Sequence, residues 1–208
     1  MAARSTVTRS GREFTFVILA GGRNKRLDGV VEPYQKPLIL VNGQPIINKL
    51  IQCIRNVDYR PFRDIVIVTS PHNVAHITDV IEPWGEDQTR NITCVVQPKP
   101  QGVPNALMHG LRAVHTEEVI VLCADNLIPP KGLDHFVHEC IKYPENHLVF
   151  AGRTFGFYRK FEVARFTRWL GDGSGFVEGP FLKQELSQET YIAWLGPVKM
   201  KTQIARTI

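Results

Sequence analysis

Two neighbouring glycines and two basic residues form the stretch of this sequence best suited to chemistry. Gly21 and Gly22 end a short apolar run, and Arg26 and Lys36 follow them. Because glycine carries no Cβ, backbone N–H groups there can come close to a ligand, and the two cationic side chains add positive charge beside them. These residue types therefore predict a site for a nucleoside triphosphate.

The alternative to a phosphate site is an ordinary strand-to-loop turn with basic residues on its surface. Arg23, Lys25 and Arg26 are close neighbours in the sequence, and like charges repel one another unless an anion joins them. This clustering favours the phosphate site. The sequence contains no Walker loop, because the lysine followed by serine or threonine is missing, and no dinucleotide GxGxxG motif.

Two polar residues, Gln97 and Asp125, each follow another apolar run at the point where a buried strand would end. Ligands of parallel α/β sheets bind beyond the carboxyl ends of the strands, so both residues are expected to meet Gly21 and Gly22 in one cleft. Taken singly, each has a simpler interpretation. Gln97 would be a loop residue that caps the next helix, and Asp125 a turn or helix cap.

The hydrophobic pattern predicts the elements that position these residues. Continuous apolar runs are typical of parallel strands covered on both faces, and apolar residues at three- and four-residue spacing are typical of helices packed on a sheet. Beyond residue 150 the pattern changes to shorter strands around a glycine-rich turn. The expected strands are 14–20, 64–69, 92–96, 119–123, 148–150, 161–170, 176–177 and 191–198, and the expected helices are 46–57, 73–81, 105–114 and 133–143.

Alternation of strands and helices predicts βαβ units, and therefore an α/β fold with a mostly parallel sheet. With 208 residues, the chain is expected to form a single domain over 14–208. Residues 1–13 are polar and basic, which predicts a disordered tail.

The composition argues against several other classes of protein. No apolar run approaches the length of a membrane span, so we expect no membrane association. The net charge of +5 comes from basic residues spread along the chain, which an anionic small substrate explains as well as a nucleic acid does, and we expect no nucleic-acid partner. The four cysteines have apolar surroundings and no CxxC pair, which predicts core residues in the reducing cytoplasm without zinc or disulfides.

Three segments in register resemble the signature of the sugar-1-phosphate nucleotidyltransferases. Residues 19–27 read LAGGRNKRL, residues 36–38 read KPL and residues 43–46 read GQPI. The family reads LAGGxGTRL, then KPL, then a GKPMI-like segment. Its loop arginine and following lysine are ten residues apart, as are Arg26 and Lys36 (36 − 26).

The resemblance continues downstream. Residues 96–102, VQPKPQG, are similar to the VQPxPxG segment of the glucose-1-phosphate thymidylyltransferases, in which the glutamine reads the pyrimidine base. A glutamine suits this role because its amide offers both a donor and an acceptor to a base edge. Residues 122–126, LCADN, correspond to an LGDN-like segment whose aspartate binds Mg²⁺.

The resemblance implies a three-layer α/β/α, Rossmann-like nucleotide-diphospho-sugar transferase fold. The implied reaction transfers a nucleoside monophosphate from dTTP or UTP to a sugar 1-phosphate and releases pyrophosphate. Arg26 would stabilise the departing pyrophosphate, Lys36 would contact the α-phosphate, and Asp125 would bind Mg²⁺. Residues 14–130 would form the nucleotide-binding half and residues 131–208 the sugar-phosphate-binding half. The implied nucleotide-binding residues are Leu19, Ala20, Gly21, Gly22, Gln97 and Gly102.

The second half departs from the family pattern. Where the family has EKP, whose lysine contacts the sugar phosphate, this sequence has Glu178-Gly179-Pro180. Glu178 and Lys183 are our candidates for the sugar phosphate, with Lys183 in place of the missing lysine. Asn24 and Lys25 replace the Gly-Thr of the glycine loop, and asparagine tolerates a left-handed backbone, so we expect the turn to persist.

These departures leave other functions open. Full-length relatives supply a second metal-binding aspartate and a C-terminal helical region beyond the point where this sequence ends, which favours a catalytically silent nucleotide-binding paralogue. A non-sugar acceptor such as phosphocholine is a further alternative. His135, His138 and Cys140 are expected to be a helix surface and a core cysteine, without a metal. The aromatic stretch 155–161 predicts a partly buried hairpin or a contact between copies of the chain, which leaves a homo-oligomer open.

Overall fold

The computed structural model describes residues 13–27, 29–32, 34–57, 62–84, 91–143, 148–154, 161–169, 175–184 and 191–206. The expected basic tail over 1–13 lies almost entirely outside these residues, as does most of the aromatic stretch 155–161. Within the described residues, no helix is both long and apolar enough to cross a membrane.

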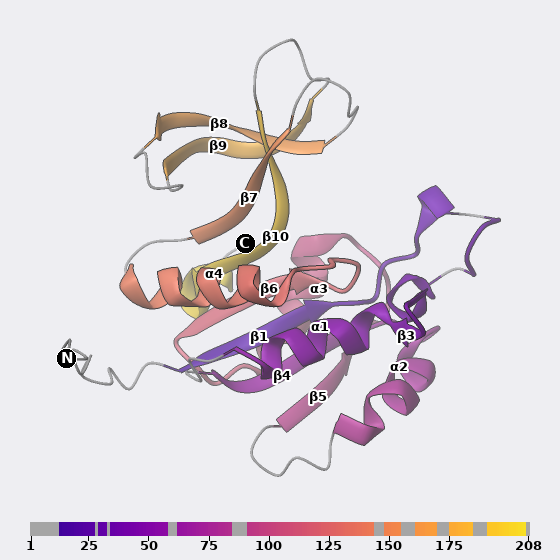
Figure 1. Cartoon of the computed structure of the whole chain (residues 1–208). Helices are drawn as coiled ribbons and strands as arrows, with labels where there is room; N and C mark the ends of the chain where they lie inside the picture. Colours follow the sequence, from indigo (N-terminus) through magenta and orange to yellow (C-terminus); the bar gives the residue numbers. More distant parts are fainter. Residues whose placement is uncertain are drawn as a thin grey trace.

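Four parallel strands form the centre of the molecule (Figure 1). They are β1 (Phe14–Leu19), β4 (Phe62–Thr69), β5 (Asn91–Val96) and β6 (Glu118–Cys123), in the spatial order β5-β4-β1-β6. β1 pairs with β4 on one side and with β6 on the other. All four strands were expected from their apolar runs, and β1 lies between β4 and β6.

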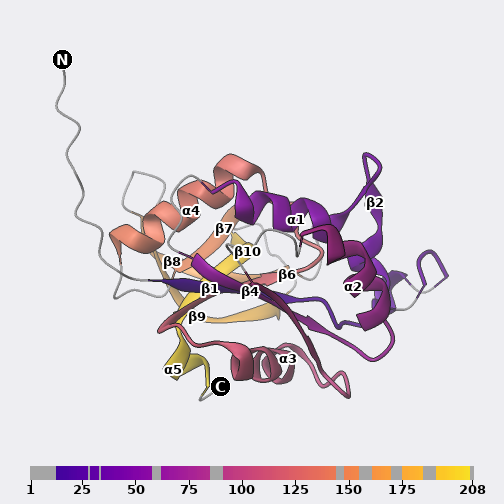
Figure 2. The same cartoon turned by 90° about the horizontal axis from the view of Figure 1, so that it is seen from below.

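Helices cover both faces of this sheet, which gives three layers (Figure 2). One face carries α1 (Ile46–Arg55), α2 (Val74–Ile81) and α4 (Pro130–Lys142), and the other carries α3 (Val103–Gly110) and α5 (Thr202–Ala205). Alternate residues of β1 serve the two layers, because Phe16 and Ile18 pack against α1 and α4 while Val17 packs against α3. Burial on both faces explains why the strand is apolar except at Thr15, whose hydroxyl accepts a hydrogen bond from Thr116 Oγ1 at 2.9 Å.

The close contact between α3 and the sheet depends on Gly110. A Cβ at this position would lie 2.8 Å from Val68 Cγ2 and 2.9 Å from Val17 Cγ1. The predicted helix over 105–114 begins two residues earlier, at Val103, since Pro104 fits a first helical turn. After Gly110 the chain continues as a 3-10 helix, η4 (Leu111–Ala113).

The remaining strands are antiparallel and extend the sheet into a second region. β10 (Tyr191–Lys201) pairs with β6 through its last residues and with β8 (Phe161–Trp169) through its first ones. It pairs with β7 (Leu148–Thr154) along both parts, with a register shift between Trp194 and Val198. β9 (Gly175–Gln184) pairs with β8. Figure 1 shows β7, β8 and β9 standing apart from the parallel strands, joined to them by β10. The fold is therefore an α/β/α sandwich with a mixed sheet, as expected.

A buried ion pair helps to join the two regions. Lys199 Nζ of β10 lies 2.9 Å from Glu118 Oε1 of β6, and both side chains are almost fully buried. Lys199 Nζ also donates to the Tyr143 carbonyl oxygen at 3.3 Å, at the end of α4. Removing either partner of such a pair would leave a buried charge uncompensated.

A small hairpin precedes α1 and was not predicted as such. β2 (Leu40–Val41) pairs with β3 (Gln44–Pro45), and Asn42 and Gly43 between them have φ values of 52° and 75°. An Asn-Gly pair suits this turn because both residues tolerate positive φ. Pro45 lies just before α1, so the predicted helix begins at Ile46, and it ends at Arg55.

Candidate active site

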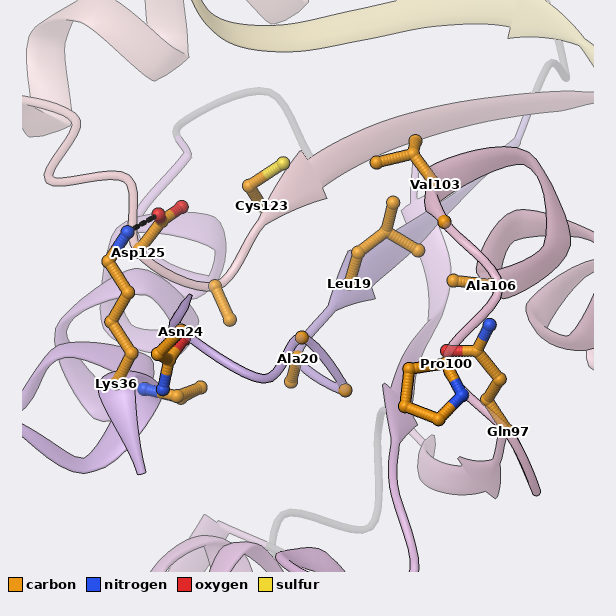
Figure 3. Close-up of a pocket in the computed structure, with 15 residues that line it drawn as sticks. Leu19, Ala20, Asn24, Lys36, Gln97, Pro100, Val103, Ala106, Cys123 and Asp125 are labelled. Carbon is orange, nitrogen blue, oxygen red and sulfur yellow. Dashed lines mark hydrogen bonds and ion pairs between the residues drawn. The ribbon is translucent and has the colours of Figure 1, made fainter. Parts of the chain in front are cut away.

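A pocket of about 230 Å³ opens at the carboxyl ends of the parallel strands, and the predicted strand-end residues meet there. In Figure 3, Lys36, Asn24 and Asp125 lie on one side, Gln97 and Pro100 lie on the other, and Leu19 and Ala20 lie between them. The expected convergence on one cleft is therefore observed. The lining residues are Leu19, Ala20, Gly21, Gly22, Asn24, Lys36, Pro37, Gln97, Pro100, Gly102, Val103, Ala106, Cys123, Ala124 and Asp125.

The glycine turn forms the floor of the pocket. A Cβ on Gly21 would lie 3.0 Å from the Thr69 carbonyl oxygen, so only glycine fits without displacing the end of β4. The Ala20 N–H donates to the Val68 carbonyl at 2.7 Å and is therefore not free for a ligand. Among the described residues nothing accepts from the N–H groups of Gly21 and Gly22, so these two remain for a phosphate.

An ion pair between Lys36 Nζ and Asp125 Oδ2 occupies the opposite side of the pocket (Figure 3). The side chains of Lys36 and Asp125 are 35% and 33% exposed, so solvent and ligands reach both. The predicted phosphate ligand and the predicted metal ligand are thus in contact with each other. A bound anion would compete with Asp125 for the N–H donors of Lys36 Nζ.

Asn24 positions the lysine. Its backbone has φ of 62°, the left-handed conformation expected for the residue that replaces glycine in the family loop. In the amide orientation that satisfies both groups, Asn24 Oδ1 accepts from the backbone N–H of Lys36 at 2.9 Å and of Gln35 at 3.3 Å. The side chain therefore holds the start of η2 (Lys36–Leu38) against the glycine loop.

Asn73 is a second positioning residue that the sequence did not reveal. Its side chain is fully buried, and its Nδ2 donates to the carbonyl oxygens of Ala20 at 2.9 Å and Tyr34 at 2.8 Å. Its Oδ1 accepts from the Ser70 N–H at 2.9 Å. One amide thus joins the residue before the glycine turn to the loop that carries Lys36. Tyr34 also stacks on His72, with ring centroids 4.5 Å apart.

Gln97 follows β5 and is 2% exposed. Its backbone N–H donates to the Thr69 carbonyl at 2.8 Å, and its side-chain Nε2 donates to Asn105 Oδ1 of α3 at 2.8 Å. The simpler interpretation, in which Gln97 caps this helix, does not hold, because the N-cap residue is Gly102 and no side-chain cap bond forms there. Gln97 is held by a helix residue while it lines the pocket.

For three other predicted site residues, the structure describes the backbone but not the side chain. Arg26 lies in the 3-10 helix η1 (Lys25–Leu27), and its side chain is outside the described part of the structure. Glu178 and Lys183 lie on β9, where their Cα partners on β8 are Arg165 and Glu162; only their backbone is described. These three residues keep their roles as predictions only.

Gly102 lies directly before α3 and lines the pocket. Its φ of 92° is a conformation that favours glycine. The turn at Gly102 joins α3 to the 97–102 loop, of which Gln97 and Pro100 also line the pocket. The role of Gly102 in nucleotide binding stays a prediction.

A single carboxylate, Asp125, is the candidate metal ligand in the pocket. Among the described residues, no group of three or more His, Cys, Asp or Glu side chains could hold a metal ion. Mg²⁺ is usually bound through one or two carboxylates together with substrate phosphates and water. Asp125 is partly exposed and lies beside the candidate phosphate site, which matches this mode of Mg²⁺ binding. The pocket therefore fits a metal ion that binds together with a nucleotide.

His135, His138 and Cys140 occupy the helix-surface and core positions expected for them. His135 and His138 are exposed on α4, and Cys140 is fully buried, where desolvation raises the pKa of its thiol. All four cysteines are free. Cys53 and Cys94 are partly buried against the core, whereas Cys123 lies at the end of β6 and lines the pocket.

A parallel sheet with a glycine turn, a lysine and an aspartate at its carboxyl edge is typical of nucleotide-binding α/β proteins. The chain belongs to the nucleotidyl transferase family, whose model matches residues 15–166. This match includes the glycine turn, Lys36, Gln97 and Asp125.

Individual relatives and solved structures agree with this family. The chain is 25% identical to a glucose-1-phosphate thymidylyltransferase of Neisseria meningitidis, over 65% of this chain and 46% of that protein, and 29% identical to one of Xanthomonas campestris, over 56% and 38%. It therefore spans less than half the length of these curated relatives. Its fold is similar to that of a UDP-glucose pyrophosphorylase in complex with UDP-glucose, with a TM-score of 0.73, 17% identity and coverage of 93% and 78%. HddC from Yersinia pseudotuberculosis has a TM-score of 0.69, 18% identity and coverage of 94% and 80%.

Proposed function

We propose that this protein is a sugar-1-phosphate nucleotidyltransferase that uses dTTP or UTP. The observation that carries the proposal is the meeting, in one pocket, of the glycine turn, Gln97 and the pair formed by Lys36 and Asp125. The curated relatives are named glucose-1-phosphate thymidylyltransferases, and one neighbour of the same fold is a complex with UDP-glucose. Both support a nucleotide and a sugar phosphate as substrates.

In the proposed reaction, a phosphate oxygen of the sugar 1-phosphate attacks the α-phosphorus of the nucleotide. The bond between that phosphorus and the oxygen that bridges to the β-phosphate breaks, and pyrophosphate leaves with the electron pair. No general base is needed, because the attacking phosphate is already ionised. The protein therefore has to position the reactants and neutralise their charge.

Five pocket residues and the nearby Arg26 have roles in this scheme. The N–H groups of Gly21 and Gly22 donate to phosphate oxygens, and Lys36, once drawn from Asp125, neutralises the α-phosphate. Arg26 stabilises the departing pyrophosphate, and Gln97 faces the base. Asp125 is the residue proposed to hold Mg²⁺, which when bound supplies further neutralisation of phosphate charge.

Pyrophosphate release tests this proposal directly. The purified chain would be incubated with Mg²⁺, each of the common nucleoside triphosphates, and glucose 1-phosphate, other sugar 1-phosphates or phosphocholine. We expect release with dTTP or UTP and a sugar 1-phosphate, at a rate well above that without the acceptor. Folded protein without turnover of any pair would refute the proposal, and turnover with phosphocholine alone would change the acceptor.

A catalytically silent nucleotide-binding protein is the second candidate. It is favoured by Glu178-Gly179-Pro180, where the family has a lysine for the sugar phosphate. Calorimetry that detects UTP or dTTP binding by a chain that releases no pyrophosphate would favour this candidate. Detectable binding of sugar 1-phosphate in the presence of nucleotide would count against it.

A further inference from the structure

We infer that Asn105 is a positioning residue that sets the base preference of the pocket. It holds the Gln97 side-chain amide with its nitrogen turned toward α3, which leaves the oxygen for the ligand. The pocket should then prefer bases that offer a ring N–H, such as uracil and thymine, over cytosine, whose corresponding ring nitrogen is an acceptor. This inference rests on the proposed function, in which Gln97 faces the base.

The position of Gln97 is fixed at both ends of the residue. The backbone N–H is bound to the Thr69 carbonyl at 2.8 Å, and the side chain is bound to Asn105 at 2.8 Å. Only 2% of the Gln97 surface is exposed, so the surrounding atoms leave little space for another side-chain rotamer. What remains undetermined for such an amide is its rotation about the last bond, which exchanges oxygen and nitrogen.

Asn105 fixes the orientation of the Gln97 amide, because Asn105 Oδ1 faces Gln97 and can only accept a hydrogen bond. Gln97 Nε2 then donates to Asn105 Oδ1, and Gln97 Oε1 turns toward the glycine turn, 3.4 Å from where a Gly21 Cβ would be. Among the described residues nothing donates to this oxygen. An acceptor that lines a pocket without a donor is best satisfied by an N–H group of the ligand.

Uracil and thymine differ from cytosine at the ring atom, N3, that this oxygen would meet. Uracil and thymine present N3–H between two carbonyl groups, so N3–H can donate to Gln97 Oε1. Cytosine presents an unprotonated N3, so two acceptors would face each other. If Asn105 were absent, the Gln97 amide would be free to rotate and present Nε2 to cytosine. Asn105 is therefore expected to act on the choice between bases more than on total affinity.

UTP and CTP are the appropriate probes because they differ only at this edge of the base. Their dissociation constants would be measured by calorimetry with Mg²⁺ present, on the full 208-residue chain. We expect the wild type to bind UTP at least about tenfold more tightly than CTP, the scale of selectivity that one aligned hydrogen bond provides. Asn105→Ala should narrow this ratio, mainly by improving CTP binding.

Two further variants separate the mechanism from a general loss of structure. Asn105→Asp can only accept, so it should keep Gln97 in the same orientation and retain the preference for UTP. Met108→Ala, on the same helix and 37% exposed, should leave the ratio unchanged. If Asn105→Ala does not fold, the wild-type ratio and Asn105→Asp still decide the matter.

Several results would overturn the inference. Equal affinities of the wild type for UTP and CTP would refute it while leaving the proposed function intact. A proportional loss of both affinities in Asn105→Ala would make Asn105 only a structural support, and loss of the preference in Asn105→Asp would exclude the assigned orientation. If the wild type bound no nucleotide, the proposed function would fail and this inference with it.

Discussion

The two sides of the pocket are held by different forces. On the base side, Gln97 is almost fully buried and is bound by neutral hydrogen bonds to Thr69 and Asn105. On the phosphate side, Lys36 and Asp125 form an ion pair that is about one-third exposed on each partner.

This difference suggests how each side responds to a ligand. A partly exposed ion pair contributes only about 0–1 kcal/mol, because water competes for both charges, so a phosphate can displace it at small cost. The buried amide contacts on the base side are costly to break and should persist when a ligand binds. The base side is thus preorganised, and the phosphate side exchanges partners.

Replacement of Asp125 by alanine tests the charged side most severely. Loss of the proposed metal ligand should reduce Mg²⁺-dependent turnover by on the order of a thousandfold, the upper end of the effect of one electrostatic contact in a transition state. The ratio of UTP to CTP binding should not change, since Gln97 is untouched. Steady-state kinetics would measure the loss of turnover. The control is Asp79→Ala, which changes an exposed residue of α2. An unchanged turnover rate would show that Asp125 is not the Mg²⁺ ligand of the reaction.

Replacement of Lys36 by methionine removes the charge but keeps much of the side-chain volume. We expect turnover to fall by about a hundredfold, because the α-phosphate loses its cationic partner. Triphosphate binding should weaken and become less sensitive to salt. Binding measured at two ionic strengths would test this, with Lys131→Met on the exposed face of α4 as control. Salt sensitivity equal to that of the wild type would argue against a phosphate contact.

Replacement of Asn73 by alanine should affect stability as well as the phosphate side. The change removes two buried bonds to backbone carbonyls and leaves the Ser70 N–H without its acceptor. We expect a loss of about 2–3 kcal/mol in the free energy of unfolding. Urea denaturation would measure it, beside the exposed helix variant Gln52→Ala. A loss no larger than that of Gln52→Ala would show that this amide does not hold the loop.

Replacement of Gly21 by alanine should have the smallest effect on stability, because the new Cβ meets only the end of β4 and the Gln97 side chain. The new Cβ would lie 3.0 Å from the Thr69 carbonyl oxygen and 3.4 Å from Gln97 Oε1, so both must shift. We expect a loss of about 1 kcal/mol in the free energy of unfolding, at the low end for overpacking. Gly22→Ala is the matched control, because nothing lies within 4 Å of its Cβ position. Equal unfolding curves for the two variants would contradict this.

Much of the fold was predictable from local patterns. The parallel strands are six to eight residues long and are built around short apolar runs, and α1 repeats its apolar residues on one face. The Asn42-Gly43 turn carried a recognisable signal that our prediction did not use. The four-residue helix α5 was not predicted, because a helix this short has little periodicity and depends on packing against the sheet.

The candidate site was predictable only in part. Gly21, Gln97 and Asp125 could be placed because each follows an apolar run, and parallel strands bring their carboxyl ends to one edge. Asn73 could not be found in this way, since its partners Ala20 and Tyr34 are 53 and 39 residues away in the chain. Hydrogen bonds between such distant residues leave no periodic trace in the sequence.

The sequence by itself determined the order of strands and helices, the glycine turn and the family signature, because these depend on residue type and short spacing. Only the tertiary structure decided which polar groups of the site already form ion pairs or hydrogen bonds within the protein. It pairs Lys36 with Asp125, gives the Ala20 N–H to the sheet, and binds Gln97 to Asn105. These contacts depend on how the loops pack at the edge of the sheet. There, a shift of a few ångströms decides whether a polar group is free to bind a ligand or is already hydrogen-bonded within the protein.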